Sequence, residues 1–143
     1  MAKPNRMSLT VAATRVFDFE IEEYSLARKM AGIGESFQSD TFGVGGYDWA
    51  VRFSPSSLSL KLALLSEMQT GERVGVKFAF TLIDKSGQAS AAVLRKKCSE
   101  LFYKGQEEGF FGFIGDKDLK KYIHGDCFTV RCTVSVLRRP KSH

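Results

Sequence analysis

The side chains that could support nucleophilic or metal chemistry are few and widely spaced in this 143-residue chain. The two histidines are His124 and His143, and they do not have the i, i+4 spacing of a zinc-binding helix. The cysteines are Cys98, Cys127 and Cys132, an odd number without a C-x-x-C pair, which argues against a disulfide framework and a zinc site. We therefore expect no catalytic residues, no bound metal and no cofactor, and we do not expect an enzyme.

The thiols have plain structural explanations. Cys132 falls on the apolar side of an alternating segment and is expected in the core, whereas Cys127 falls on the opposite face. Nothing near Cys127 in the sequence would lower the pKa of its thiol, which a reactive cysteine needs. Reduced cysteines are typical of a cytoplasmic or nuclear protein, and we expect one of these locations.

Two patterns that often accompany ligand binding are weak here. The Gly-Val-Gly-Gly stretch at 43–46 lacks the G-x-x-x-x-G-K-[ST] pattern of a phosphate loop, and a hairpin turn explains it better. The net charge is +5, but the basic clusters at 95–97, 120–121 and 138–141 are short and scattered, which favours solvated surface. No apolar run approaches the length of a membrane span. Neither nucleic acid nor membrane is an expected partner.

The elements that position these side chains are mostly strands. Alternation of apolar and polar residues indicates half-buried strands, because successive side chains of a strand point to opposite faces. The alternating segments are 16–21, 42–53, 58–65, 74–83 and 128–136. Gly45 and Gly46 interrupt the second segment and predict a turn or bulge. Trp49 lies on the apolar face of that segment and is expected in the core.

Helical patterns are short. Residues 25–30 predict one helical turn, and 117–123 predict a short helix with Asp116 as its cap and Gly125 at its end. The Asp-Lys-Ser-Gly stretch at 84–87 predicts a turn. The apolar residues of 91–102 have helical spacing, so periodicity alone favours a helix there. Many strands with few helices imply an antiparallel sandwich or barrel.

Three separated segments resemble a known family. They are 17–26 (Phe-Asp-Phe-Glu-Ile-Glu-Glu-Tyr-Ser-Leu), 39–49 (Ser-Asp-Thr-Phe-Gly-Val-Gly-Gly-Tyr-Asp-Trp) and 125–134 (Gly-Asp-Cys-Phe-Thr-Val-Arg-Cys-Thr-Val). In this order they resemble MATH (meprin and TRAF homology) domains. The sequences of the three segments are most similar to those of the plant proteins that join a MATH domain to a BTB domain. The resemblance covers residues 14–137, leaving 1–13 as a flexible N-terminal segment and 138–143 as a basic C-terminal tail.

The resemblance implies an all-β fold, an eight-stranded antiparallel sandwich of the TRAF type with one or two short helices. It also places a strand over 98–103, where periodicity favours a helix. We expect the strand, because three distant motifs outweigh one ambiguous window. No heptad repeat is present to drive the trimerisation known in TRAF domains, so we expect a monomer.

The resemblance also implies a shallow groove that holds an extended peptide of a partner protein. Family groove positions fall at Lys61, Phe78, Glu100, Gln106, Glu107, Glu108, Gly109, Phe110 and Phe113. Three aromatic positions of the family are charged here, namely Lys61, Glu100 and Glu108. The groove would then have an apolar floor of Phe78, Phe110 and Phe113 with charged walls, and the alternative that Phe78 is simply a core residue remains open.

The function implied is recognition of short peptide segments in protein partners. In the MATH–BTB branch the partner is a ubiquitination substrate, and cullin-3 ligase is reached only through a BTB domain, which this sequence does not contain. The domain would therefore act as the substrate-recognition part of such a ligase adaptor or as a stand-alone MATH protein. The alternative is a structural or oligomerisation domain of the TRAF type without peptide binding.

Overall fold

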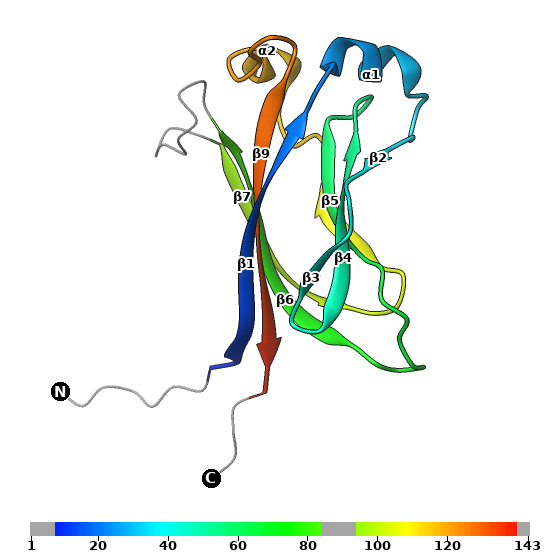
Figure 1. Cartoon of the computed structure of the whole chain (residues 1–143), viewed down its shortest axis with the longest axis vertical. Helices are drawn as coiled ribbons and strands as arrows, with labels where there is room; N and C mark the ends of the chain where they lie inside the picture. Colours follow the sequence, from blue (N-terminus) through cyan, green and yellow to red (C-terminus); the bar gives the residue numbers. More distant parts are fainter. Residues whose placement is uncertain (1–7, 84–93, 140–143) are drawn as a thin grey trace, which may run out of the picture.

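The computed structural model describes residues 8–83 and 94–139 (Figure 1). The elements in chain order are β1 (Thr10–Ile21), α1 (Tyr24–Met30), β2 (Phe37–Gln38), β3 (Phe42–Val44), β4 (Tyr47–Ser54), β5 (Ser59–Leu64), β6 (Val74–Ile83), β7 (Arg95–Phe102), β8 (Glu107–Phe110), α2 (Asp116–Leu119) and β9 (Phe128–Arg138). The turn expected at 84–87 lies outside the described residues.

The strands form two antiparallel sheets packed face to face (Figure 1). One sheet has the order β1-β9-β6-β7, and the other has the order β2-β4-β5-β8 with β3 also paired to β4. Alternate residues of each strand point between the sheets and form one continuous apolar core. The all-β sandwich expected from the sequence is confirmed.

The described residues contain nine strands, but β2 and β3 are two halves of one edge strand along β4. Gln38 pairs with Arg52 and Phe42 pairs with Trp49, so the edge strand advances one residue more than β4 between these pairs. At the break, the Ser39 N–H donates to the Val51 carbonyl, and the Ser39 hydroxyl accepts from the Val51 N–H, each at 2.9 Å. This is the geometry of a bulge, and with the halves joined the sandwich has the eight strands expected.

The segment 95–102 is a strand, as the resemblance implied, and not the helix that its periodicity favours. β7 pairs along β6 from Thr81↔Arg95 to Val74↔Phe102. The long strand β6 offers a row of main-chain partners at its edge, and this tertiary pairing overrides a weak local preference. Only residues 94–102 of the ambiguous window are described.

Helix α2 differs from the expected helix. It spans Asp116–Leu119 rather than 117–123, and its N-cap is Gly115, with no side-chain cap hydrogen bond. The Asp116 carboxylate instead forms a two-point ion pair with Arg28 of α1. An ion pair with a neighbouring helix thus takes the carboxylate that the sequence assigned to capping.

Helix α1 closes one end of the sandwich beside α2 (Figure 1). Its first turn is capped from the far end of the chain by Asp126. The Asp126 carboxylate accepts hydrogen bonds from the Ser25 N–H at 3.1 Å and from the Ser25 hydroxyl at 2.7 Å. The main-chain carbonyl of Asp126 accepts a hydrogen bond from the Tyr24 N–H at 3.0 Å. Asp126 thereby satisfies two of the free N–H groups at the helix start, those of Tyr24 and Ser25, without a side-chain cap from the helix itself.

The core contains Trp49 at its centre, fully buried. The indole N–H donates to the Val44 carbonyl at 3.2 Å, and the ring packs edge-to-face on Phe102 at 5.4 Å between centroids. The expectation that Trp49 is a core residue is confirmed.

The sandwich extends slightly beyond the expected boundaries. β1 begins at Thr10, within the segment 1–13 that we expected to be flexible, because Thr10 pairs with Arg138 at the end of β9.

Candidate functional site

Two sheet edges lie on the same side of the sandwich, where β7 ends one sheet and β8 ends the other. The Leu82 N–H donates to the Leu94 carbonyl, so alternate residues of β7 bond to β6 and the others direct their N–H and C=O groups to the open side. The second group includes Lys97, Ser99 and Leu101. The open side therefore carries main-chain donors and acceptors of β7.

The same reasoning applies to β8. The Leu64 N–H donates to the Gln106 carbonyl at 3.0 Å, so Glu107 and Gly109 direct their main-chain groups away from β5. Gly109 fits this place because its backbone lies against β5. A Cβ there would lie 2.6 Å from the Lys61 Cα, which leaves no room for a side chain. The glycine thus keeps β8 tightly paired.

The three phenylalanines expected in the groove lie together between the sheets. Phe110 contacts Phe78 at 6.2 Å and Phe113 at 5.9 Å between ring centroids. Phe78 is 2% exposed and Phe113 is 1% exposed, whereas Phe110 is partly exposed. Phe78 is therefore a core residue covered by Phe110, and of the three only Phe110 offers apolar surface to a ligand.

Glu100 and Glu108 flank this cluster from the two edges. Burial raises the pKa of the Cys98 thiol, and the nearby carboxylates of Glu100 and Glu108 raise it further. This places both acids around Cys98 and keeps the thiol neutral, so Cys98 has none of the activation of a nucleophile. Lys96 lies on the same face of β7, with its ammonium 5.4 Å from the Phe113 ring centroid, so this edge carries charges of both signs around an unactivated thiol.

Gln106 joins the two edges. Its side-chain amide donates to the Leu101 carbonyl at 3.1 Å and to the Glu108 carboxylate at 2.8 Å, and its carbonyl accepts from the Tyr103 N–H at 3.0 Å. These hydrogen bonds join β7 to β8 at Leu101. Gln106 does not contact the stretch of β7 around Lys97 and Ser99 in this way.

Lys61 and Glu107 lie on the outer face of the second sheet, not on the face of Glu100 and Glu108. Lys61 pairs with Gly109 in register, and its neighbours along β5 point into the core. Glu107 bonds Arg52 at 2.7 Å and Lys61 at 3.3 Å. The hydrogen bond from Arg52 is the main cause that lowers the pKa of Glu107. Lys61 therefore does not line the same surface as Glu100 and Glu108, which corrects the expected groove.

Arg52 was absent from the expected site, and so was Gln38, whose side chain accepts from Arg52 at 2.9 Å. Their alternation places both on the outer face, but no local pattern indicates that β4 lies beside β5 and β8 in this register. The outer-face network of Gln38, Arg52, Glu107 and Lys61 is a product of tertiary pairing.

The arrangement offers contact surface rather than reactive groups. No group of three or more histidine, cysteine or acidic residues is placed to hold a metal ion within residues 8–83 and 94–139. Burial raises the pKa of the Cys132 thiol to about 12. In the described part of the chain, no helix is long and apolar enough to cross a membrane.

Known proteins of similar sequence point to one family. A model of the MATH domain family matches residues 16–134. The BTB/POZ and MATH domain-containing protein 3 of Arabidopsis thaliana is 36% identical over 138 residues, 84% of this chain and 33% of the relative. The protein 5 of the same series is 34% identical over 148 residues, covering 91% of this chain and 35% of the relative. This chain thus spans about a third of the length of these relatives. The chain belongs to the MATH domain family.

Proposed function

We propose that this domain binds a short extended segment of a partner protein at the open edge formed by β7 and β8. One observation carries the proposal: both edge strands direct main-chain N–H and C=O groups to the same side, next to the partly exposed Phe110. An extended peptide recognised in this way gains affinity from main-chain hydrogen bonds and specificity from side-chain contacts.

The peptide would pair with β7 around Lys97 and Ser99, because Gln106 already engages the main chain at Leu101. One apolar side chain of the peptide would cover Phe110. This apolar contact supplies affinity, since removal of apolar area from water is the main favourable contribution.

The acids at the edge would select the charge of the peptide. Glu107 is engaged by Arg52 and Lys61, so Glu100 and Glu108 remain as the acids on the inner side of the edge. Exposed charge pairs contribute about 0–1 kcal/mol each, so they tune peptide choice more than overall affinity. A basic or polar residue near Glu108 is the preferred match.

In a longer protein that also holds a BTB domain, the MATH domain would select substrates for a cullin-3 ubiquitin ligase. Alone, it would bind its target without delivering it. In either setting, the domain would be a monomeric module of the cytoplasm or nucleus that acts by binding and not by catalysis. Support comes from the relatives, whose names pair MATH with BTB/POZ domains.

The test is a peptide selection on the 143-residue chain, followed by titration of one selected peptide. We expect a basic or polar residue among the winners and weaker binding at higher salt, because salt screens the acids. Glu108→Lys should disfavour basic peptides, and Glu108→Trp should favour peptides led by an apolar residue.

The matched control is Glu67→Lys, which reverses an acid whose side chain is 93% exposed and which pairs, among the described residues, with Lys104 alone. It should leave peptide choice unchanged. If neither substitution at Glu108 alters peptide choice, the edge is not the binding site. If the selection yields no peptide, the structural role without peptide binding is favoured instead.

A further inference from the structure

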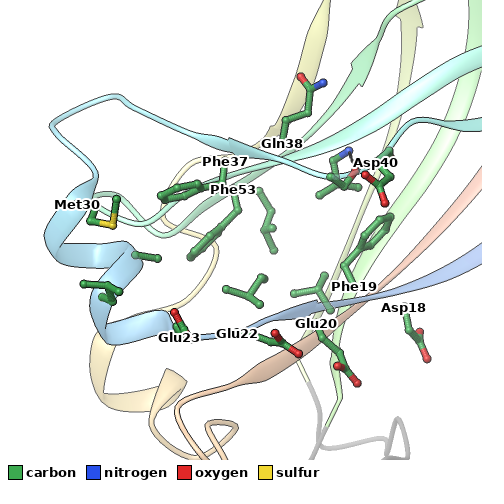
Figure 2. Close-up of a pocket in the computed structure, with 17 residues that line it drawn as sticks. Asp18, Phe19, Glu20, Glu22, Glu23, Met30, Phe37, Gln38, Asp40 and Phe53 are labelled. Atoms are coloured by element: carbon green, nitrogen blue, oxygen red, sulfur yellow. Dashed lines mark hydrogen bonds between the residues drawn. The ribbon is translucent and has the colours of Figure 1, made fainter.

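A cleft of about 550 Å³ opens on the side of the sandwich away from β7 and β8, between β1 and β2 (Figure 2). Helix α1 bounds one end. At the other end, Phe17 packs on Phe42 with centroids 4.2 Å apart, and the Arg15 guanidinium donates to the Gly43 carbonyl at 2.9 Å. The cleft is therefore a bounded channel along β1 from Asp18 to the start of α1.

The inside of the cleft is apolar. Figure 2 shows the side chains of Phe19, Phe37 and Phe53 directed into it, and buried residues of β5 and β9 complete the floor. Large apolar side chains at the mouth are exposed: Leu26 at 51%, Met30 at 69% and Phe37 at 45%. A cleft with such a mouth has apolar surface that a partner would remove from water.

One wall of the cleft is the free edge of β1. Even-numbered residues of β6 bond to β7, as the bond from Leu82 to Leu94 shows, so odd-numbered residues of β6 bond to β9. By the same alternation, odd-numbered residues of β1 bond to β9. Asp18 and Glu20 therefore direct their N–H and C=O groups into the cleft.

The side chains of this edge point the other way. Figure 2 shows the Asp18 and Glu20 carboxylates on the far side of β1 from the cleft. Asp18 is paired with Arg131 at 2.8 Å, whereas Glu20 and Glu22 form no ion pair within the described ranges 8–83 and 94–139. No lysine or arginine of the described part of the chain lines the cleft, although the chain carries a net charge of +5.

We propose that this cleft binds a second extended segment of a partner protein, one in which apolar and basic residues alternate. A strand added beside β1 shares faces with it, because cross-strand neighbours point to the same side. Residues opposite Phe19 and Ile21 would enter the apolar cleft. Residues opposite Glu20 and Glu22 would lie beside free carboxylates, where lysine or arginine is the complement.

A second copy of this chain is a poor occupant of the cleft. Its own β1 would bring the same alternation, with aspartate and glutamate opposite Glu20 and Glu22, and like charges directly opposite one another destabilise a strand pair. The charge of the edge thus argues for a basic partner and against self-association.

The test uses three synthetic peptides on the whole chain. The first alternates lysine with valine and isoleucine, the second has the same composition with the lysines grouped at one end, and the third has glutamate in place of lysine. We expect measurable binding by calorimetry for the first peptide only. Amide NMR shifts should fall on Asp18–Glu22 and Phe37–Asp40.

Two pairs of variants separate charge from main-chain pairing. Reversal of both acids, Glu20→Lys with Glu22→Lys, should weaken the first peptide about tenfold and admit the third, while Glu67→Lys should change neither. Glu20→Pro removes the N–H that faces the cleft but no bond to β9, so it should weaken binding more than Glu20→Gln.

Several outcomes would overturn the proposal. Equal binding of the grouped and alternating peptides would show that the peptide does not pair with β1 as a strand. Unchanged binding in the Glu20→Lys, Glu22→Lys variant would show that these acids do not select the charge of the peptide. Loss of binding in Glu108→Lys would place the peptide at the β7–β8 edge instead. A concentration-dependent dimer in ultracentrifugation that the double reversal abolishes would make a second copy the occupant.

Discussion

The Glu107 carboxylate illustrates how one residue can be structural where a ligand contact was expected. It holds two cations, Arg52 and Lys61, over the small residues of the outer sheet face. Its side chain is 35% exposed, so solvent screens both pairs. The network links side chains of β4, β5 and β8 across this face and adds little to stability.

This network predicts a pH dependence. Because Arg52 holds the pKa of Glu107 below its ordinary value of 4.5, the stabilisation is complete above pH 4.5 and is lost as pH falls through the folded-state pKa. Glu107→Gln should lower the free energy of unfolding at neutral pH by about 1 kcal/mol or less. Urea denaturation should show the difference from wild type shrinking in acid. A difference that grows in acid would contradict the assignment.

The site residues were only partly predictable from the sequence. The alternation of 58–65 already places Lys61 opposite to the leucines, so its outward direction follows from local pattern. The partnership of Lys61 with Arg52 and Glu107 does not follow, because it depends on which strands pair and in which register. Similarly, the burial of Phe78 beneath Phe110 needs the second sheet to be in place.

At the scale of elements, β8 is a short strand that depends on close contact with β5. Gly109→Ala would force a methyl group against the Lys61 backbone, and we expect a loss of about 1–3 kcal/mol in the free energy of unfolding. Gly75→Ala is the control, because a Cβ there meets only the Leu137 Cβ at an ordinary 3.8 Å. Thermal denaturation of both variants should give a lower melting temperature for Gly109→Ala than for Gly75→Ala. Equal melting temperatures would contradict the close contact between β8 and β5.

Most elements were predictable because their alternation is long, and the misses have local causes. The strand β6 was expected at 74–83 and spans those residues, since its flanks carry polar residues. Helix α2 was misjudged because its capping carboxylate binds Arg28 instead. The bulge at Ser39 could not be predicted from the sequence. It depends on a hydrogen bond between the Ser39 hydroxyl and the N–H of Val51, twelve residues away on β4.

At the scale of the whole molecule, the two sheets are held together by a core in which Trp49 contacts both. Trp49→Ala should cost about 3–5 kcal/mol, enough to unfold many domains. Phe111→Ala is the control, because that ring is 82% exposed and its loss should be nearly neutral. Chemical denaturation gives both values, and a Trp49 variant as stable as wild type would contradict the packing described here.

The pairing of β1 with β9 has a consequence for synthesis on the ribosome. Among the described strands of this domain β1 is made before the others, yet its strand partner β9 is made after them. A nascent chain needs on the order of ten seconds to extend from Ile21 to Arg138, and during that time β1 has no place in a sheet. The cap of α1, supplied by Asp126, arrives equally late. Asp18 and Glu20 place like charges on one face of β1 near its end, which disfavours the pairing of two nascent copies of this part of the strand before the sandwich closes.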